Sequence, residues 1–156
     1  MKIGIPKEIY QNERRVALTP DTAARLQNLG YECAIESGAG VHASFSDKAY
    51  QDAGVEIISD ANSLWQQSDI VLKVRSPEDN ELGMMRQDGK LISFIWPAQN
   101  EELMNSMSTG SRSVLAMDSV PRISRAQKFD ALSSMANIAG YRAVIEASNH
   151  FGRFFT

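Results

Sequence analysis

Four side chains near the C-terminal end of the sequence carry the groups needed to bind a carboxamide or a ribose. They lie on a predicted loop that runs into a long helix, and they are Arg122, Gln127, Asp130 and Ser133. Each of them can form hydrogen bonds, and such a loop can close over a ligand while the helix behind it fixes its root. The same residue types also cap helices, because their oxygens accept from free backbone N–H groups. A capping loop is therefore the alternative interpretation.

The elements that must position this loop follow from the pattern upstream of it. Short apolar runs predict strands at residues 3–5, 33–35, 57–58, 70–74, 91–95 and 114–117. Helices are expected between them: one begins at Thr19 and Pro20 and ends near Gly30, Ser46 caps a second, and residues 63–67 and 101–107 form two more. Strands joined by helical crossovers predict an α/β fold, a Rossmann-like three-layer parallel sheet with right-handed connections.

From residue 128 to residue 155 the spacing of apolar residues changes, and it predicts one long C-terminal connecting helix. An apolar stripe recurs at spacings of three or four, at Leu132, Met135, Ala139, Ala143, Ala147, Phe151 and Phe154. At ~1.5 Å per residue this helix would reach roughly 40 Å, which is longer than a small domain needs. We therefore expect residues 1–156 to be one domain whose helix leads to a second domain. With that domain absent, Phe151, Phe154 and Phe155 would be uncovered, and self-association as a dimer is expected.

Composition limits the classes of function. The chain is 43% hydrophobic and 22% charged, which is typical of a soluble globular domain. Its net charge is −3, without a basic run, so nucleic acid is not an expected partner. There is no signal peptide and no apolar run long enough to span a membrane, so we expect this chain to work in water on the cytoplasmic side.

Metal and thiol chemistry are not expected. His42 and His150 have no partner at metal-ligand spacing, so no metal site is predicted. Cys33 is the one cysteine, and it falls in a predicted strand, where a buried inert thiol is the simplest interpretation. Trp65 is expected to be a packing anchor, and the methionines at positions 84, 85, 104 and 107 are expected to fill the core.

A glycine-rich segment matches the dinucleotide fingerprint by spacing. Residues 38–43 fit G-x-G-x-x-A after a predicted strand, and Asp60 follows at about the right distance. The pyrophosphate requires a helix N-terminus directly after the glycines, however, and the next helix is expected only at Ser46. We therefore expect Gly38 and Gly40 to be turn glycines with positive φ.

Several segments together resemble the alpha subunit of proton-translocating NAD(P) transhydrogenase. In order along the chain they read KIGIPKE, NERRVALTP, ESGAG followed by ASFSDKAY, DIVLKVRSP, SFIWPAQN and AMDSVPRISRAQ. The similarity covers essentially the whole chain. It implies the first Rossmann-like domain of the NAD(H)-binding part, with NAD held mainly by a second Rossmann domain beyond this chain.

The resemblance also implies roles for the loop. Gln127 and Asp130 would be the catalytic positioning residues, with Gln127 between the two nicotinamide rings. Arg122, Asp130 and Ser133 would orient the carboxamide and the ribose. NADP would be carried by a partner, the beta subunit or NADP-binding domain, and membrane segments elsewhere would translocate protons. The family also implies a homodimer at the cytoplasmic face of the inner membrane, and we expect the isolated chain to be inactive.

Two further interpretations remain. In the related alanine dehydrogenases the positions of Arg15 and Lys73 hold the substrate's carboxylate and carbonyl, so an alanine or saccharopine dehydrogenase relative is the enzymatic alternative. Without the resemblance, the sequence predicts that Arg15 is a solvated or helix-contacting side chain and that Lys73 extends from a strand end to place its ammonium group in solvent. Alanine dehydrogenases place a histidine where this chain has Trp96, which cannot move a proton at neutral pH. The third interpretation is a non-catalytic oligomerisation or regulatory module.

Overall fold

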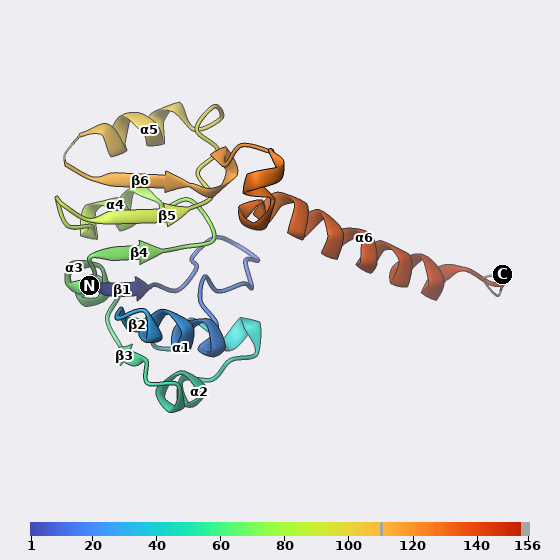
Figure 1. Ribbon diagram of the computed structural model, residues 1–156, viewed down its shortest axis with the longest axis horizontal. Coiled ribbons are helices and arrows are strands. Elements are labelled where there is room, and N and C mark those ends of the chain that lie inside the picture. Colours follow the sequence, from blue (N-terminus) through green and yellow to red (C-terminus); the bar gives the residue numbers. More distant parts are fainter. Residues whose placement is uncertain (110, 154–156) are drawn as a thin grey trace. The chain divides into compact units, whose positions relative to one another are not determined.

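The computed structural model describes residues 1–109 and 111–153, and the chain divides into two compact units (Figure 1). The first unit is Met1–Ala116 and the second begins at Met117.

The first unit is built on a six-stranded parallel sheet. Its strands are β1 (Lys2–Ile5), β2 (Glu32–Glu36), β3 (Glu56–Ile58), β4 (Ile70–Leu72), β5 (Lys90–Ser93) and β6 (Ser113–Ala116). They lie in the order β3-β2-β1-β4-β5-β6, and each neighbouring pair is parallel. This confirms the predicted Rossmann-like sheet. The strand order reverses between β1 and β4, and this switch point is where open α/β sheets usually bind ligands.

Side-chain caps set the start of the crossover helices. Helix α1 (Pro20–Asn28) is capped by Thr19 and α2 (Asp47–Asp52) by Ser46, as predicted. Helix α3 (Ala61–Gln67) begins before the predicted start at Ser63, because the Asp60 carboxylate accepts from the Ser63 N–H at 2.7 Å. Helix α5 (Glu101–Ser108) agrees closely with the prediction. Helix α4 (Asp79–Met84) was not predicted.

The sheet has an apolar core on each face. On one face Ile3, Ile5 and Ile35 pack with Tyr50 of α2. On the other face Val71 and Leu91 pack with Trp65, Leu82, Met85 and Met107, which belong to or adjoin helices α3, α4 and α5. Trp65 is therefore the expected packing anchor, and Cys33 is the expected buried thiol, whose pKa is raised by burial. Met104 is exposed rather than part of the core.

The second unit consists of short 3₁₀ turns followed by one long helix. The 3₁₀ helices are η2 (Met117–Ser119) and η3 (Ser124–Phe129), and the long helix is α6 (Ala131–His150). The predicted helix over 128–155 is therefore shorter at both ends, because Lys128 and Phe129 belong to η3 and Phe151 already leaves the helix. The predicted positions Phe154 and Phe155 lie outside the described residues.

Helix α6 does not have the single apolar stripe that was predicted. Ile138, Tyr141 and Val144 lie on the opposite side of the helix from that stripe, and all three are exposed. A helix that is apolar on several sides is typical of one enclosed by other elements. No helix among the described residues is long and apolar enough to cross a membrane.

Candidate cofactor site

The predicted loop residues meet at the junction of η3 and α6. Arg122 precedes η3, Gln127 lies within it, Asp130 caps α6, and Ser133 lies in the first turn of α6. Together with Ile123 and Ser124 these four residues line a cavity of about 250 Å³. The structure thus brings all four predicted site residues to one cavity.

Asp130 is the centre of this group. Its carboxylate accepts from the Ser133 backbone N–H at 3.1 Å and from the Ser133 hydroxyl at 2.5 Å. The Arg122 guanidinium approaches the same carboxylate, with Nε 4.0 Å from Oδ2. Hydrogen bonding to Ser133 lowers the pKa of Asp130, and the Arg122 charge adds to this effect. Asp130 is therefore a carboxylate at neutral pH, and it fixes the orientation of the Ser133 hydroxyl.

The chemical groups around the cavity are complementary to a carboxamide. Arg122 is a donor, Asp130 is an acceptor, and the Gln127 amide is both. The alternative interpretation, that the loop caps a helix, is also confirmed: the Asp130 carboxylate caps α6 by accepting from the Ser133 N–H. The two roles are compatible, since a capped helix end holds these side chains in a fixed geometry.

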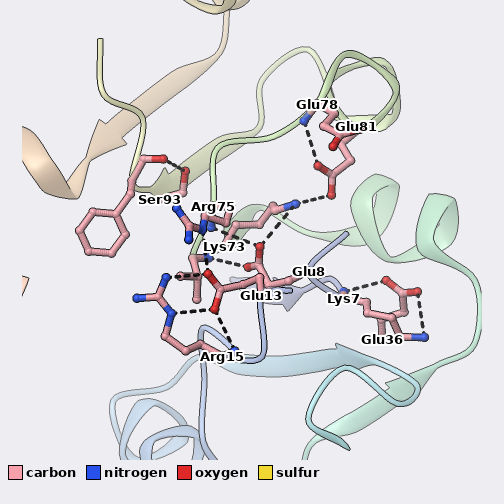
Figure 2. A network of polar contacts seen from close by, with 12 residues as sticks. Lys7, Glu8, Glu13, Arg15, Glu36, Lys73, Arg75, Glu78, Glu81 and Ser93 are labelled. Atoms are coloured by element: carbon pink, nitrogen blue, oxygen red, sulfur yellow. Dashed lines mark hydrogen bonds and ion pairs between the residues drawn. The ribbon is translucent and has the colours of Figure 1, made fainter. Parts of the chain in front are cut away.

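A second polar group occupies the switch point of the sheet, between the segment after β1 and the segment after β4 (Figure 2). Lys73 follows β4 and its side chain is 1% exposed. Figure 2 shows its ammonium group between two carboxylates: it is hydrogen-bonded to Glu81 of α4 and lies 3.9 Å from Glu8 Oε2. The expectation that Lys73 snorkels into solvent was wrong, because these two buried carboxylates compensate its charge in the interior.

Glu8 ties the two segments together. Its carboxylate accepts from the backbone N–H groups of Val74 at 2.6 Å and Arg75 at 3.2 Å. Burial raises the pKa of Glu8, while the Lys73 charge and these two hydrogen bonds oppose the rise. The loop after β1 is thereby fixed against the end of β4.

Glu13 holds two arginines in the same network. It accepts from Arg15 Nε at 2.7 Å and from Arg15 Nη2 at 2.6 Å, and Arg75 Nε donates to it at 2.7 Å. The hydrogen bonds from Arg15 are the main cause that lowers the pKa of Glu13 to about 2. Arg75 also lies over the Tyr10 ring, 4.7 Å from its centroid. Arg15 is therefore held in a fork by Glu13 and is not a freely solvated side chain.

Three carboxylates of this network, Glu8, Glu13 and Glu81, were missed by the sequence analysis. Their roles depend on partners far along the chain, such as the pairing of Glu8 with the segment after β4. Charged residues are mostly exposed, so burial of these carboxylates was not expected from residue type.

The glycine-rich segment is not built to hold a pyrophosphate. A 3₁₀ helix (Val41–Ala43) follows Gly40, and α2 begins only at Asp47. Gly38 has the expected positive φ of 77°, but Gly40 does not, with φ −83°. Gly40 is required for close packing instead, because a Cβ there would lie 2.6 Å from the Tyr50 ring. Asp60, the presumed acidic partner, caps α3.

The described residues also contain no cluster of three or more side chains suited to a metal ion. His42 lies in the 3₁₀ helix after the glycine turn and His150 at the end of α6. Both side chains are exposed.

Comparison with known proteins identifies the family. The family described as "Alanine dehydrogenase/PNT, N-terminal domain" matches residues 4–139. The chain belongs to this family. NAD(P) transhydrogenase subunit alpha of Cereibacter sphaeroides is 62% identical over 156 residues, which are 100% of this chain and 30% of that protein.

Two solved structures support the same relationship. Transhydrogenase from Sinorhizobium meliloti superimposes with a TM-score of 0.91 and 37% identity, over 98% of this chain and 46% of that chain. An L-alanine dehydrogenase superimposes with a TM-score of 0.74 and 32% identity, over 77% of this chain and 33% of that chain. The chain thus corresponds to the N-terminal part of transhydrogenase alpha subunits, spans less than half of these relatives, and is related to alanine dehydrogenase.

Proposed function

We propose that the chain is the first Rossmann-like domain of the NAD(H)-binding part of a proton-translocating transhydrogenase. In the intact enzyme, hydride would pass between NADH and NADP, coupled to proton movement through membrane segments elsewhere in the complex. The high similarity to a transhydrogenase alpha subunit supports this assignment. The complex would lie at the cytoplasmic face of the inner membrane and would contain two copies of this domain.

The observation that carries the proposal is the cavity at the start of α6. Its lining combines the donor Arg122 with the acceptors Asp130 and Ser133 Oγ, and the Gln127 amide supplies both functions. This set fits the amide and carbonyl of a nicotinamide carboxamide, together with a ribose hydroxyl. The hydrogen-bonding groups of the side chains that line the cavity support this assignment.

The residues of the cavity would act by positioning. Bound NADH supplies the hydride, so the protein needs no nucleophile and no general base. Arg122 would donate to the carboxamide oxygen. The Ser133 hydroxyl gives its hydrogen to Asp130 at 2.5 Å, so its oxygen would accept from the carboxamide amide. Gln127 would bridge toward the second nucleotide and fix the separation of the two rings. Such orientation contributes much of the rate when two bound reactants must meet.

Most of the cofactor would be held outside this chain. The segment after Gly38 lacks the helix N-terminus that a pyrophosphate needs, so NAD would lie mainly on a second Rossmann domain of the same subunit. NADP would be carried by the beta subunit or an NADP-binding domain. The domain 1–156, with α6 as its connecting helix, would present the cavity to both.

A keto-acid dehydrogenase is the second candidate, favoured by the similarity to alanine dehydrogenase. Arg15 and Lys73 share one network at the switch point, as substrate-binding residues would. Trp96, after β5, cannot act as the acid or base that reductive amination needs. The transhydrogenase assignment is therefore the better one.

One experiment separates these functions. The complete alpha subunit that contains this sequence, assembled with its partner subunit, is assayed for reduction of an NADP analogue by NADH and for NADH-dependent amination of pyruvate. We expect the first reaction and not the second. Amination without transhydrogenation would reject the proposal, and the absence of both would favour a non-catalytic module.

A further inference from the structure

One wall of the cavity at the start of α6 is apolar. The described residues that line this cavity are Arg122, Ile123, Ser124, Gln127, Asp130 and Ser133. All of these side chains except that of Ile123 carry hydrogen-bonding groups. The polar side chains match a carboxamide and a ribose, whereas the flat faces of a nicotinamide ring carry no hydrogen-bonding group. Ile123 is therefore the lining residue that hydrogen bonding does not explain.

The backbone of Ile123 is held from both sides. Its N–H donates to the Pro121 carbonyl at 2.9 Å, which closes a three-residue turn around Arg122. Its own carbonyl accepts from the Ala126 N–H at 2.9 Å, and η3 begins at the next residue. The isoleucine side chain is branched at Cβ, which restricts rotation about χ1. Ile123 thus presents a stiff apolar surface to the cavity at a fixed place.

Packing within its own unit does not explain this isoleucine. Ile123 is 57% exposed, and it belongs to none of the apolar clusters formed by the described residues. An apolar residue beside a helix start can pack back onto the helix, but such packing would bury it. Single exposed isoleucines are common on protein surfaces, so exposure alone does not indicate a site. The position of Ile123 in an otherwise polar cavity is what indicates a ligand with an apolar face.

The charges around Ile123 offset one another. Arg122 Nε lies 4.0 Å from Asp130 Oδ2, so the cavity lining combines one cation with one anion. The nicotinamide ring changes charge in hydride transfer, because it is neutral in NADH and positively charged in NAD⁺. An apolar contact stabilises a neutral ring and disfavours a charged one, since a cation loses hydration there. Ile123 can therefore distinguish the two oxidation states of the cofactor.

We propose that the Ile123 side chain packs against one face of the nicotinamide ring and makes the cavity prefer the reduced cofactor, NADH, over NAD⁺. This inference rests on the proposed function, because it requires the ring to enter the cavity. Ile123 acts as a positioning and specificity residue: it removes water from one face of the ring while the polar side chains orient the carboxamide. The opposite face of the ring then remains open toward the second nucleotide.

Binding of NADH and of NAD⁺ to the complete alpha subunit tests this role. The variants are Ile123→Val and Ile123→Thr, whose side chains share one branched shape and differ by a methyl group replaced with a hydroxyl. This pair separates apolarity from shape. The matched control is Val41→Thr, because Val41 is 59% exposed and also lies in a 3₁₀ helix, η1 (Val41–Ala43). Titration calorimetry gives both dissociation constants, the fluorescence of bound NADH reports the polarity around its ring, and thermal unfolding reports folding.

We expect Ile123→Thr to weaken NADH binding about fivefold and NAD⁺ binding less than about twofold, because an apolar contact stabilises mainly the neutral ring. The fluorescence of bound NADH should fall in this variant. Ile123→Val and the control should keep both affinities of the parent within about twofold, and thermal unfolding should be unchanged throughout, since Ile123 is exposed. Equal losses for NADH and NAD⁺, or unchanged affinities in Ile123→Thr, would overturn the role of Ile123. A parent subunit that binds neither cofactor would instead overturn the proposed function.

Discussion

Lys73 illustrates how a single residue can link two distant segments of the chain. Its ammonium group contacts Glu81 and Glu8, and both carboxylates are nearly inaccessible to solvent. Lys73→Met would remove the only positive charge that contacts this buried pair among the described residues. We expect the free energy of unfolding of the 156-residue chain to fall by about 3–5 kcal/mol, because breaking a buried ion pair leaves uncompensated charge.

Chemical denaturation of this variant is compared with that of Lys48→Met. Lys48 forms an exposed ion pair with Asp52 on α2, so its loss should change the unfolding free energy by less than about 0.5 kcal/mol. Equal effects of the two substitutions would show that the switch-point network does not stabilise the fold.

Glu13 should give stability a specific pH dependence. Its pKa is about 2 in the folded chain, against an ordinary value of 4.5. A carboxyl whose pKa is lowered by folding stabilises the folded state above its unfolded pKa, and this contribution is lost as pH falls toward the folded pKa. The difference in free energy of unfolding between the parent and Glu13→Gln should therefore reach its maximum above about pH 5 and decrease as pH falls toward 2. A difference that stays constant from pH 7 to pH 3 would contradict the assigned ion pairs.

At the scale of elements, α6 contains an interior glycine that its own unit does not require. A Cβ added at Gly140 would meet no atom within 4 Å. Gly140→Ala should therefore stabilise the helix by about 0.5–1 kcal/mol, because glycine loses more backbone entropy on folding. Slower hydrogen exchange of the α6 amides in the 156-residue chain is the measurement.

Gly30→Ala is the matched control. Gly30 also has open space around it, but its φ is +88°. The same substitution there should destabilise the chain by about 1–2 kcal/mol, since an L side chain is strained in that conformation. Faster exchange in Gly140→Ala would mean that α6 is not a regular helix at this position.

The elements that the sequence predicted correctly are those with local signals. Thr19 with Pro20 and Ser46 marked helix starts, and short apolar runs marked all six strands. Helix α4 was missed because its N-cap is Glu78 rather than Ser, Thr, Asp or Asn, and because Glu81 is held by Lys73 from outside the helix. The four residues predicted to form the site lie close together in sequence, and their proposed roles came from the family resemblance. The switch-point network instead depends on pairs such as Glu8 with Val74. Long-range contacts of that kind leave no local pattern.

For the whole molecule, the proposed division of cofactor binding between two domains gives a direct prediction. The 156-residue chain has no helix N-terminus directly after its glycine turn, and its cavity would contact only the nicotinamide end of NADH. We expect the chain alone to bind NADH with a dissociation constant above roughly a millimolar, which is less than about 4 kcal/mol of binding free energy. Titration calorimetry of the chain with NADH measures this dissociation constant. A micromolar value would reinstate residues 38–43 as a nucleotide site.

Single-turnover hydride transfer in the complete assembly tests whether the η3–α6 cavity positions two nicotinamide rings. Gln127→Asn shortens the side chain by one methylene, and Asp130→Asn removes the charge beside Arg122 while keeping an oxygen that can cap α6. We expect both substitutions to slow hydride transfer more than tenfold while NADH affinity stays within about threefold, because misplacement affects mainly the transition state. Unchanged hydride transfer in both variants would contradict this positioning role and leave the loop only its capping role.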